Sequence, residues 1–488
     1  AFKIFIDSCH ANGIAVILDI AMNHAFGQSP LAQMWWDPLA NAPAANSPYF
    51  NTVPKHDYNV GYDFNHESEA TRNMRNIIFS YWLQEFNVDG YRFDLSKGYT
   101  QTNTLGDVGL WGQYDATRIA IWKDIADVLY TVEEDAILIL EHFAVNTEEE
   151  ELSDYGFLLW GNSNYNYAQG TMGYTGSDIN WMSYVARGWS DPHVMGYMES
   201  HDEERLMYKN ISFGNSGNPD YNVKYLPVAL SRMELAGAFF FTIPGPKMIW
   251  QFGELGYDIS IDYGCRVCNK PVLWNYYDIA SRLRINQVWS ELIKLKTTYP
   301  AFSSTSFILN VGGSGKRINL NNDEMNVTVI GNFDVYNASV NPNFQHTGFW
   351  YEYFSGDTIN VSNISQTINL LPGEYRLYTD VKLNTPDIII SIEELASAMQ
   401  HELLVSPNPS GNLFNLSADL ATSGEVAISI YNLKGELVFE DAVISNAGAF
   451  NYTWSGNTTD GSAIPTGTYL CKMQTSAGVY LAKLMKVQ

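Results

Sequence analysis

The first part of the chain alternates between short apolar runs and longer amphipathic stretches. Residues 15–20 form an apolar run of strand length, as expected for a strand buried on both faces of a parallel sheet. Residues 2–12 carry apolar side chains at helical spacing, and Gly13 follows at the position where a helix-ending glycine is common. The same alternation predicts further strands at 87–94, 136–141, 155–160, 194–198 and 247–251, and helices at 67–86, 115–134, 226–241 and 278–296.

Six buried strands separated by helices predict a parallel α/β architecture, either a doubly wound sheet or a barrel. Polar residues that cluster at the carboxyl ends of the predicted strands favour the barrel, because in a (β/α)8 barrel those ends converge on one pocket. They are Asp19, Asn23, His24, Arg92, Asp94, Glu141, His201 and Asp202.

An eight-stranded barrel leaves two strands unaccounted for, and we expect them to precede Ala1. Residues 1–5 have no initiator Met, no charged leader and no cleavage site, and they read as the middle of an amphipathic helix. We therefore expect a fragment that lacks the first two strands of a (β/α)8 TIM barrel. Such a fragment should have unpaired sheet edges and little activity by itself.

The pattern of the sequence changes after Pro300, where helical periodicity ends and β-branched and turn-forming residues become frequent. We predict a catalytic barrel at 1–297 with a short insertion at about 25–66. An all-β C domain at 298–380, a linker at 381–402 and a β-sandwich at 403–488 follow.

The composition excludes some classes of protein. A formal charge of −25 argues against a nucleic-acid partner, because the phosphate backbone would be repelled. No apolar run of about eighteen residues is present, so no transmembrane segment is predicted. Aromatic residues make up 14% of the chain, which suits stacking on sugar rings, although most of them are expected to fill cores. Cys265 and Cys268 form an isolated C-x-x-C pair, for which free thiols or one small disulfide loop are favoured over zinc.

A pocket with several carboxylates suits glycoside hydrolysis, in which one carboxylate attacks and another acts as acid and then base. Arg92 and Asp94 are two residues apart on one predicted strand, so both side chains point to the same side and Arg92 can keep Asp94 ionised. Glu141 emerges at the end of an apolar strand, where burial can raise the pKa of a carboxylic acid. A carboxylate at a strand end is still more often structural, so spacing alone supports these roles only in part.

Four ordered motifs resemble the conserved regions of the α-amylase family, glycoside hydrolase family 13. They are LDIAMNH at 18–24, GYRFDLSK at 90–97, LE at 140–141 and MESHD at 198–202. The segment YDFN at 62–65 is similar to a further short motif of this family. The resemblance covers about residues 1–297 and implies the TIM-barrel fold, and the all-β stretch behind it looks like the family's C domain.

Carried over position by position, the resemblance implies that Asp94 is the nucleophile, Glu141 the acid and base, and Asp202 a third essential carboxylate. Arg92 would orient the nucleophile, and the substrate-binding residues would be His24, His201 and Lys97. Asp19 is expected to be a structural residue of the strand end. No cofactor is required for this chemistry.

Two positions depart from the family pattern. Ser200 stands where many members have Asn, and the run from Ser200 to Glu203 also occurs in branching enzymes. Gly98 occupies a position where calcium-dependent members often have His. Asn23 matches a frequent calcium ligand, so it is the candidate metal ligand for a structural calcium ion whose other ligands remain unassigned.

The tail resembles the C-terminal sorting domain of the type IX secretion system of Bacteroidetes. The matching segments are residues 406–409, 428–435, 465–469 and 483–486. This resemblance implies a secreted or cell-surface protein and the type IX secretion machinery as a partner, with a generic β-sandwich module as the alternative.

Together these features predict a retaining α-amylase that cleaves α-1,4-glucosidic bonds in starch- or glycogen-type α-glucans. An α-glucan transglycosylase such as a branching enzyme is the first alternative. A non-catalytic surface glucan-binding protein is the second.

Overall fold

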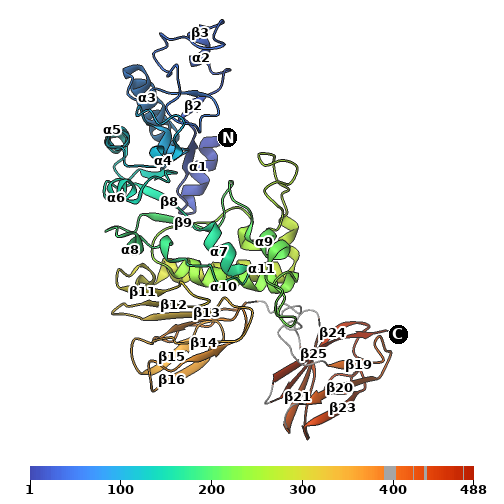
Figure 1. The fold of residues 1–488 in the computed structure, drawn as a ribbon. Coiled ribbons are helices and arrows are strands. Elements are labelled where there is room, and N and C mark those ends of the chain that lie inside the picture. Colours follow the sequence, from blue (N-terminus) through green and yellow to red (C-terminus); the bar gives the residue numbers. More distant parts are fainter. Residues whose placement is uncertain (389–402, 421–422, 433–436, 476–477, 488) are drawn as a thin grey trace.

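The computed structural model describes residues 1–388, 403–420, 423–432, 437–475 and 478–487. A mixed α/β region comes first, and an all-β domain and a second all-β domain follow it (Figure 1). The predicted fold class is confirmed: a TIM-barrel core is followed by all-β C-terminal domains. The greater part of the predicted linker at 381–402 lies outside the described residues.

A six-stranded sheet forms the centre of the α/β region. Its order is β1-β6-β7-β8-β9-β10, and every neighbouring pair is parallel. The strands are β1 (Ile17–Ile20), β6 (Gly90–Phe93), β7 (Ile137–Leu140), β8 (Leu158–Asn162), β9 (Val194–Tyr197) and β10 (Lys247–Met248). All six strands predicted from the apolar runs are therefore present, and each is shorter than or offset from its predicted range.

The sheet is an open arc, since β1 and β10 stand at its two ends and pair with no further strand in the described residues. A closed TIM barrel has eight strands, so two more between β10 and β1 would complete the circle. That such strands precede residue 1 stays a prediction.

Helices follow the strands as the periodicity predicts. The long ones are α1 (Phe2–Ala11), α3 (Glu69–Phe86), α5 (Ala116–Val132), α10 (Leu226–Thr242) and α11 (Ala280–Thr298). The Asp115 carboxylate begins α5 by accepting hydrogen bonds from the amides of Thr117 and Arg118. Asn87 ends α3 in the left-handed conformation with φ 56°.

The insertion after β1 consists of short elements that lie at one end of the molecule (Figure 1). They are β2 (His24–Ala25), α2 (Pro30–Met34), β3 (Trp36–Asp37), β4 (Ala42–Pro43) and β5 (Tyr62–Asp63). Strand β2 pairs with β5 in the register His24↔Asp63. This pairing brings the motif at 62–65 beside His24 of the motif at 18–24, although the two are far apart in the sequence.

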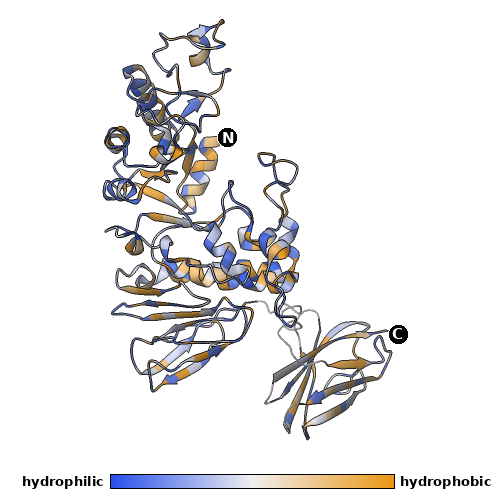
Figure 2. Cartoon of the chain, viewed as in Figure 1, coloured by the Kyte–Doolittle hydropathy of each residue, from blue (hydrophilic) through white to orange (hydrophobic). Residues whose placement is uncertain are grey.

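One apolar core joins α10 and α11 to the first all-β domain. Helix α10 is buried along almost its whole length, and Figure 2 shows its largely apolar character. Phe239 packs edge-on against Phe333, which directly follows β13 (Val327–Asn332), with ring centroids 5.2 Å apart. A side chain at Gly331 would clash with Phe239 and Leu235, so the close approach of helix and strand requires glycine there.

The first all-β domain has a six-stranded sheet in the order β11-β12-β13-β18-β15-β16 and a second pair, β14-β17. Its other strands are β11 (Phe307–Asn310), β12 (Gly315–Leu320), β14 (Ala338–Val340), β15 (Gly348–Glu352), β16 (Thr358–Val361), β17 (Ile368–Leu370) and β18 (Tyr375–Thr379).

The C-terminal domain is a sandwich of two antiparallel sheets, β19-β20-β23 and β22-β21-β24-β25. Its strands are β19 (Leu404–Ser406), β20 (Phe414–Leu420), β21 (Gly424–Asn432), β22 (Leu437–Ser445), β23 (Gly448–Trp454), β24 (Gly467–Thr475) and β25 (Gly478–Lys486). Its core draws only on residues after 402. Within the described residues, no helix combines the length and the apolar character needed to cross a membrane.

Candidate active site

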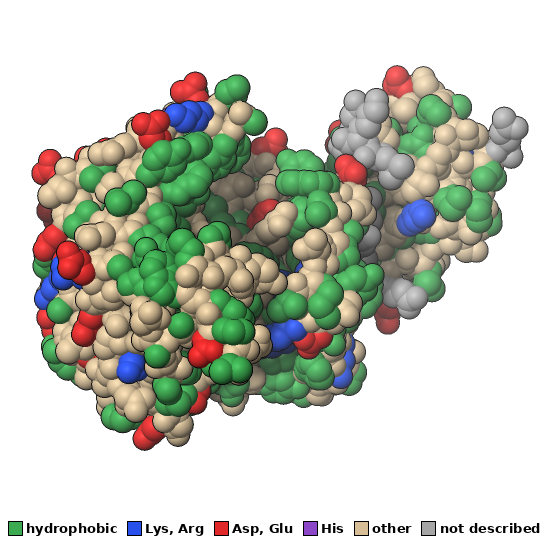
Figure 3. Space-filling model, turned by 90° about the horizontal axis from the view of Figure 1, so that it is seen from above, with side chains coloured by type: hydrophobic (Ala, Val, Ile, Leu, Met, Phe, Trp, Pro, Cys, Tyr) green, Lys and Arg blue, Asp and Glu red, His purple; other side chains and the backbone are tan. Residues whose placement is uncertain are grey.

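The predicted site residues gather at the carboxyl ends of the central strands. Asp94 directly follows β6 and Glu141 directly follows β7, and the parallel register places Asp19 opposite Arg92. Seen from above, a hollow opens in the α/β region, and acidic side chains are visible inside it (Figure 3). The convergence of strand ends that favoured a barrel is therefore present.

Arg92 is the hub of this cluster. Its Nη1 donates to Asp19 Oδ1 and to Asp94 Oδ1, both at 2.8 Å, and its Nη2 donates to Glu141 Oε2 at 2.6 Å. The guanidinium lies 4.3 Å above the ring of Trp160 from β8, which covers its flat face. One buried cation thus fixes three carboxylates, and Asp19 has the structural position expected for it.

Glu141 is partly buried, with 12% of its side chain exposed, and its pKa is raised to about 7. Burial is the main cause, and the charges of Asp94 and Asp202 act in the same direction. Arg92 and the Leu95 amide, which donates to Oε2 at 3.0 Å, oppose this shift. Near neutral pH a large fraction of Glu141 therefore holds a proton that it can give to a bound molecule.

A buried network behind Glu141 fixes its backbone. Ser96 Oγ donates to the Glu141 carbonyl at 2.7 Å and lies 2.9 Å from His142 Nδ1. His142 Nε2 lies 2.7 Å from Glu148 Oε1, and the guanidinium of Arg118 binds both oxygens of Glu148. Sequence reasoning missed this support, because its members are spread from Ser96 to Glu148 with no shared motif.

Asp202 and His201 lie on the turn after β9 and are more exposed. The Asp202 side chain is 56% exposed, and its Oδ2 lies 3.4 Å from His201 Nε2. The His201 ring lies between Trp160 and Trp250, with centroid distances of 6.2 and 5.9 Å. No hydrogen bond joins Asp202 to Arg92 among the described residues, so Asp202 is not one of the carboxylates that Arg92 holds.

His24 lies at the start of β2, within range of the Asp94 charge. Burial lowers the pKa of His24, and the charge of Asp94 partly offsets this, so the imidazole is neutral at neutral pH and close to Asp94. Asn23 Nδ2 lies 3.1 Å from His24 Nδ1 and orients the ring. The structure therefore places His24 and Asp94 on the same hollow.

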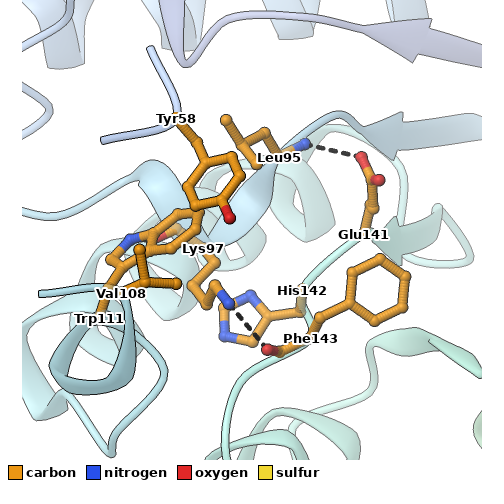
Figure 4. A pocket seen from close by; sticks show the side chains of 8 residues that line it. All are labelled: Tyr58, Leu95, Lys97, Val108, Trp111, Glu141, His142 and Phe143. Atoms are coloured by element: carbon orange, nitrogen blue, oxygen red, sulfur yellow. Dashed lines mark hydrogen bonds between the residues drawn. The ribbon is translucent and has the colours of Figure 1, made fainter. Parts of the chain in front are cut away.

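A pocket of about 230 Å³ opens beside Glu141 (Figure 4). It is lined by Tyr58, Leu95, Lys97, Val108, Trp111, Glu141, His142 and Phe143. Lys97 Nζ lies 4.1 Å above the Trp111 ring and donates to the Phe143 carbonyl at 2.9 Å. Lys97 was predicted from the motif, whereas Tyr58, Val108 and Trp111 come from stretches without a recognisable pattern.

Asn23, the candidate calcium ligand, contacts polar side chains of the insertion. Its Oδ1 lies 3.3 Å from His56 Nε2, and its Nδ2 donates to Asn59 at 3.1 Å. A buried oxygen of nearby Asp63 has no hydrogen-bond partner, but the described part of the chain has no group of three or more His, Cys, Asp or Glu side chains that could hold a metal. Calcium takes about six to eight oxygen ligands. The predicted calcium ion at Asn23 thus stays a prediction, and no chemical step is derived from it.

Several known proteins are similar to this chain. It is 23% identical over 317 residues to the 1,4-alpha-glucan branching enzyme GlgB of Bacillus cereus, which covers 60% of this chain and 43% of that enzyme. The same figures hold for the enzyme from Bacillus anthracis. The chain therefore spans less than half of the length of these curated relatives.

Two solved structures share the fold. An alpha-amylase from Geobacillus thermoleovorans in complex with acarbose superimposes with a TM-score of 0.57 at 15% identity, covering 78% of this chain and 80% of that one. A type I pullulanase from Bacillus subtilis in complex with maltose gives a TM-score of 0.56 at 18% identity, covering 77% of this chain and 55% of that one.

The C-terminal sandwich matches a different family. Residues 411–478 match the FlgD Ig-like domain. This match fits the generic β-sandwich that was the alternative for the tail, and the sorting role stays a prediction.

Proposed function

We propose that this chain belongs to the α-amylase family and is a retaining glycoside hydrolase that cleaves α-1,4-glucosidic bonds in starch- or glycogen-type glucans. The observation that carries the proposal is the pair of carboxyl groups on one guanidinium, Asp94 and Glu141, of which Glu141 has a pKa near 7. Similarity in fold to an alpha-amylase and a pullulanase supports the same class of substrate.

The two carboxyl groups divide the reaction between them. Protonated Glu141 donates its proton to the departing oxygen while Asp94 attacks the anomeric carbon, which gives a covalent glycosyl intermediate. Glu141 then takes a proton from water, which attacks the same carbon and releases the sugar. Retaining enzymes hold these groups about 5–5.5 Å apart, and inverting enzymes about 6.5–9.5 Å apart. Because one guanidinium binds both groups, the shorter separation is favoured.

The remaining residues bind sugar in this proposal. Asp202 accepts hydrogen bonds from sugar hydroxyls, and His24 and His201 contact the glucose at the cleavage point. Lys97 and the aromatic wall of the pocket in Figure 4 take the sugar on the far side of the broken bond.

Transfer to a second glucan is the competing function, and a specific observation favours it. The curated relatives are branching enzymes, and the turn after β9 carries the run from Ser200 to Glu203, in which the Ser200 hydroxyl donates to the Glu203 carboxylate. A transferase needs the same Asp94 and Glu141 but passes the intermediate to a sugar hydroxyl instead of water.

Products from amylose separate the two functions. We expect the full-length protein to release reducing ends steadily, as measured by a reducing-sugar assay, with no new α-1,6 linkages in the proton NMR spectrum. The Asp94→Asn variant serves as the blank. New α-1,6 branches without reducing ends would instead establish a branching enzyme, and starch binding without any cleavage would establish a glucan-binding protein.

The C-terminal sandwich is a secretion signal in this proposal. We propose that residues 403–488 direct the protein through the type IX machinery to the cell surface or beyond it. The support is the motif resemblance of the tail, together with a core that is built from its own residues.

Deleting residues 403–488 should leave the kcat on amylose within about twofold, because the active-site residues and the tail have separate cores. In the native host the truncated enzyme should accumulate inside the outer membrane, as measured by activity in cell fractions. Normal secretion of the truncated enzyme would contradict the role as a secretion signal and would favour an accessory module.

A further inference from the structure

The loop after β10 carries the C-x-x-C pair, and the structure closes it as a disulfide between Cys265 and Cys268. The four-residue loop is also tied from outside. Lys270 Nζ donates to the carbonyls of Cys265 at 2.7 Å, Cys268 at 2.9 Å and Arg266 at 3.3 Å. A covalent bond and one ammonium group thus fix a segment that lies on the surface.

This loop contacts the turn that carries Asp202. Arg266 Nη2 donates to the backbone carbonyl of Asp202, across 64 positions in the sequence. A second contact joins the same two loops. The Glu204 carboxylate, after β9, accepts from Ser260 Oγ at 2.7 Å and from the Ile261 amide at 2.9 Å, both after β10. The loops after β9 and β10 therefore hold each other through two separate contacts, one made by Arg266 and one by Glu204.

The rest of the turn after β9 is fixed from within the α/β region. Asn164 Nδ2 donates to the carbonyls of Met198 at 2.8 Å and Glu204 at 2.9 Å, and so holds its two ends. Arg205 Nη1 donates to the carbonyls of Ser200 and Glu203. Neither side chain reaches the Asp202 carbonyl. Within the turn the Asp202 amide donates to Ser200 Oγ at 3.0 Å, but packing does little to fix the largely exposed Asp202 side chain, and Arg266 adds a second restraint at the carbonyl.

We infer that Arg266 is a positioning residue for Asp202, and that the Cys265–Cys268 disulfide keeps Arg266 in place. This inference rests on the proposed function, in which Asp202 binds the sugar during cleavage. Opening the disulfide allows the loop to gain conformational entropy by becoming mobile. The backbone that carries the long Arg266 side chain is then no longer held in one position. Asp202 then samples positions that fit the transition state less well, and the reaction slows.

Three variants test the inference on the full-length protein. Arg266→Ala removes the contact, Arg266→Lys retains a donor, and Cys265→Ser with Cys268→Ser removes the cross-link. Val267→Ala is the matched control, because Val267 lies inside the same loop and the residue is 93% exposed. We expect kcat on maltooligosaccharides to fall roughly 10- to 100-fold in Arg266→Ala and in the double serine variant, with KM within about threefold. Arg266→Lys should recover part of the loss, and Val267→Ala should behave as wild type.

Reduction gives an independent readout. Dithiothreitol donates two electrons and two protons to the disulfide, which opens to two thiols while the reagent closes to its own cyclic disulfide. Wild-type kcat should fall to that of the double serine variant, which should not respond. The other described cysteines, Cys9 and Cys471, are free and cannot account for such a change.

Amide hydrogen exchange separates this inference from the proposed function. The peptide covering residues 199–206 should exchange faster in the double serine variant and in Arg266→Ala, whether or not the protein cleaves glucan. Faster exchange in a protein without glucan activity would overturn the proposed function and leave the restraint intact. Unchanged exchange and kcat would overturn the restraint, and a rise in KM alone would make Arg266 a substrate contact instead.

Discussion

Asp94→Asn is expected to reduce kcat on amylose by roughly 10⁴-fold or more while the protein keeps its fold and its affinity for glucan. The amide keeps an oxygen that can accept from Arg92 Nη1, so the hydrogen bond at 2.8 Å can persist. It cannot supply the negative oxygen that attacks the anomeric carbon. Steady-state rates with a reducing-sugar assay measure the loss, and the melting temperature shows that folding is unchanged.

Asp19→Asn is the matched control, because Asp19 accepts from the same Nη1 at the same distance. Its side chain is 65% exposed and belongs to the edge strand β1. We expect at most about a tenfold loss, through a less firmly held Arg92. Equal losses in the two variants would mean that both carboxylates act only by holding Arg92, and the nucleophile would have to be sought elsewhere.

Glu141→Gln is expected to divide substrates by their leaving groups. Hydrolysis of amylose, whose leaving alcohol needs a proton, should fall on the order of 10³-fold. A maltoside with a nitrophenyl leaving group should keep most of its first-step rate, because that group departs without help. Single-turnover release of nitrophenol measures this step. A similar loss on both substrates would count against Glu141 as the acid.

The pH profile follows from the same residue. The acid must be protonated, and its pKa in the folded protein is raised to about 7, so wild-type kcat should fall as pH rises through about 7. This fall of kcat at high pH should be absent when Glu141→Gln acts on the nitrophenyl substrate. Glu149 of α6 (Asn146–Asp154) is the control, since burial also raises its pKa to about 7 but its carboxylate pairs with Arg187 at 2.8 Å. The Glu149→Gln variant should still show the fall of kcat as pH rises through about 7.

The sequence predicted the order of strands and helices because apolar periodicity is a local signal. It placed the ends less well for physical reasons that differ between strands. Residues 87–94 were predicted as one strand, but Asn87 is used to end α3, so β6 begins only at Gly90. Residues 247–251 were predicted as a strand, but β10 pairs only with β9 and leaves the sheet after Met248.

The candidate site also has a part that the sequence predicted and a part that it did not. Residues inside the four motifs, including Arg92, Asp94 and Glu141, were predicted, and the structure brings them together. The wall formed by Tyr58 and Trp111 and the contact from Arg266 to Asp202 depend on long-range packing. A single sequence has no local pattern for contacts of that kind.

The sharing of one guanidinium by three carboxylates also leaves the hollow short of positive charge. A neutral glucan gains little from this field until its glycosidic bond begins to break and positive charge builds up at the anomeric carbon. A sugar mimic that carries a protonated nitrogen at that position meets the same field from the start. Inhibitors of this protein should therefore be amines, and they should bind more tightly above pH 7, where Glu141 joins the other carboxylates in ionised form.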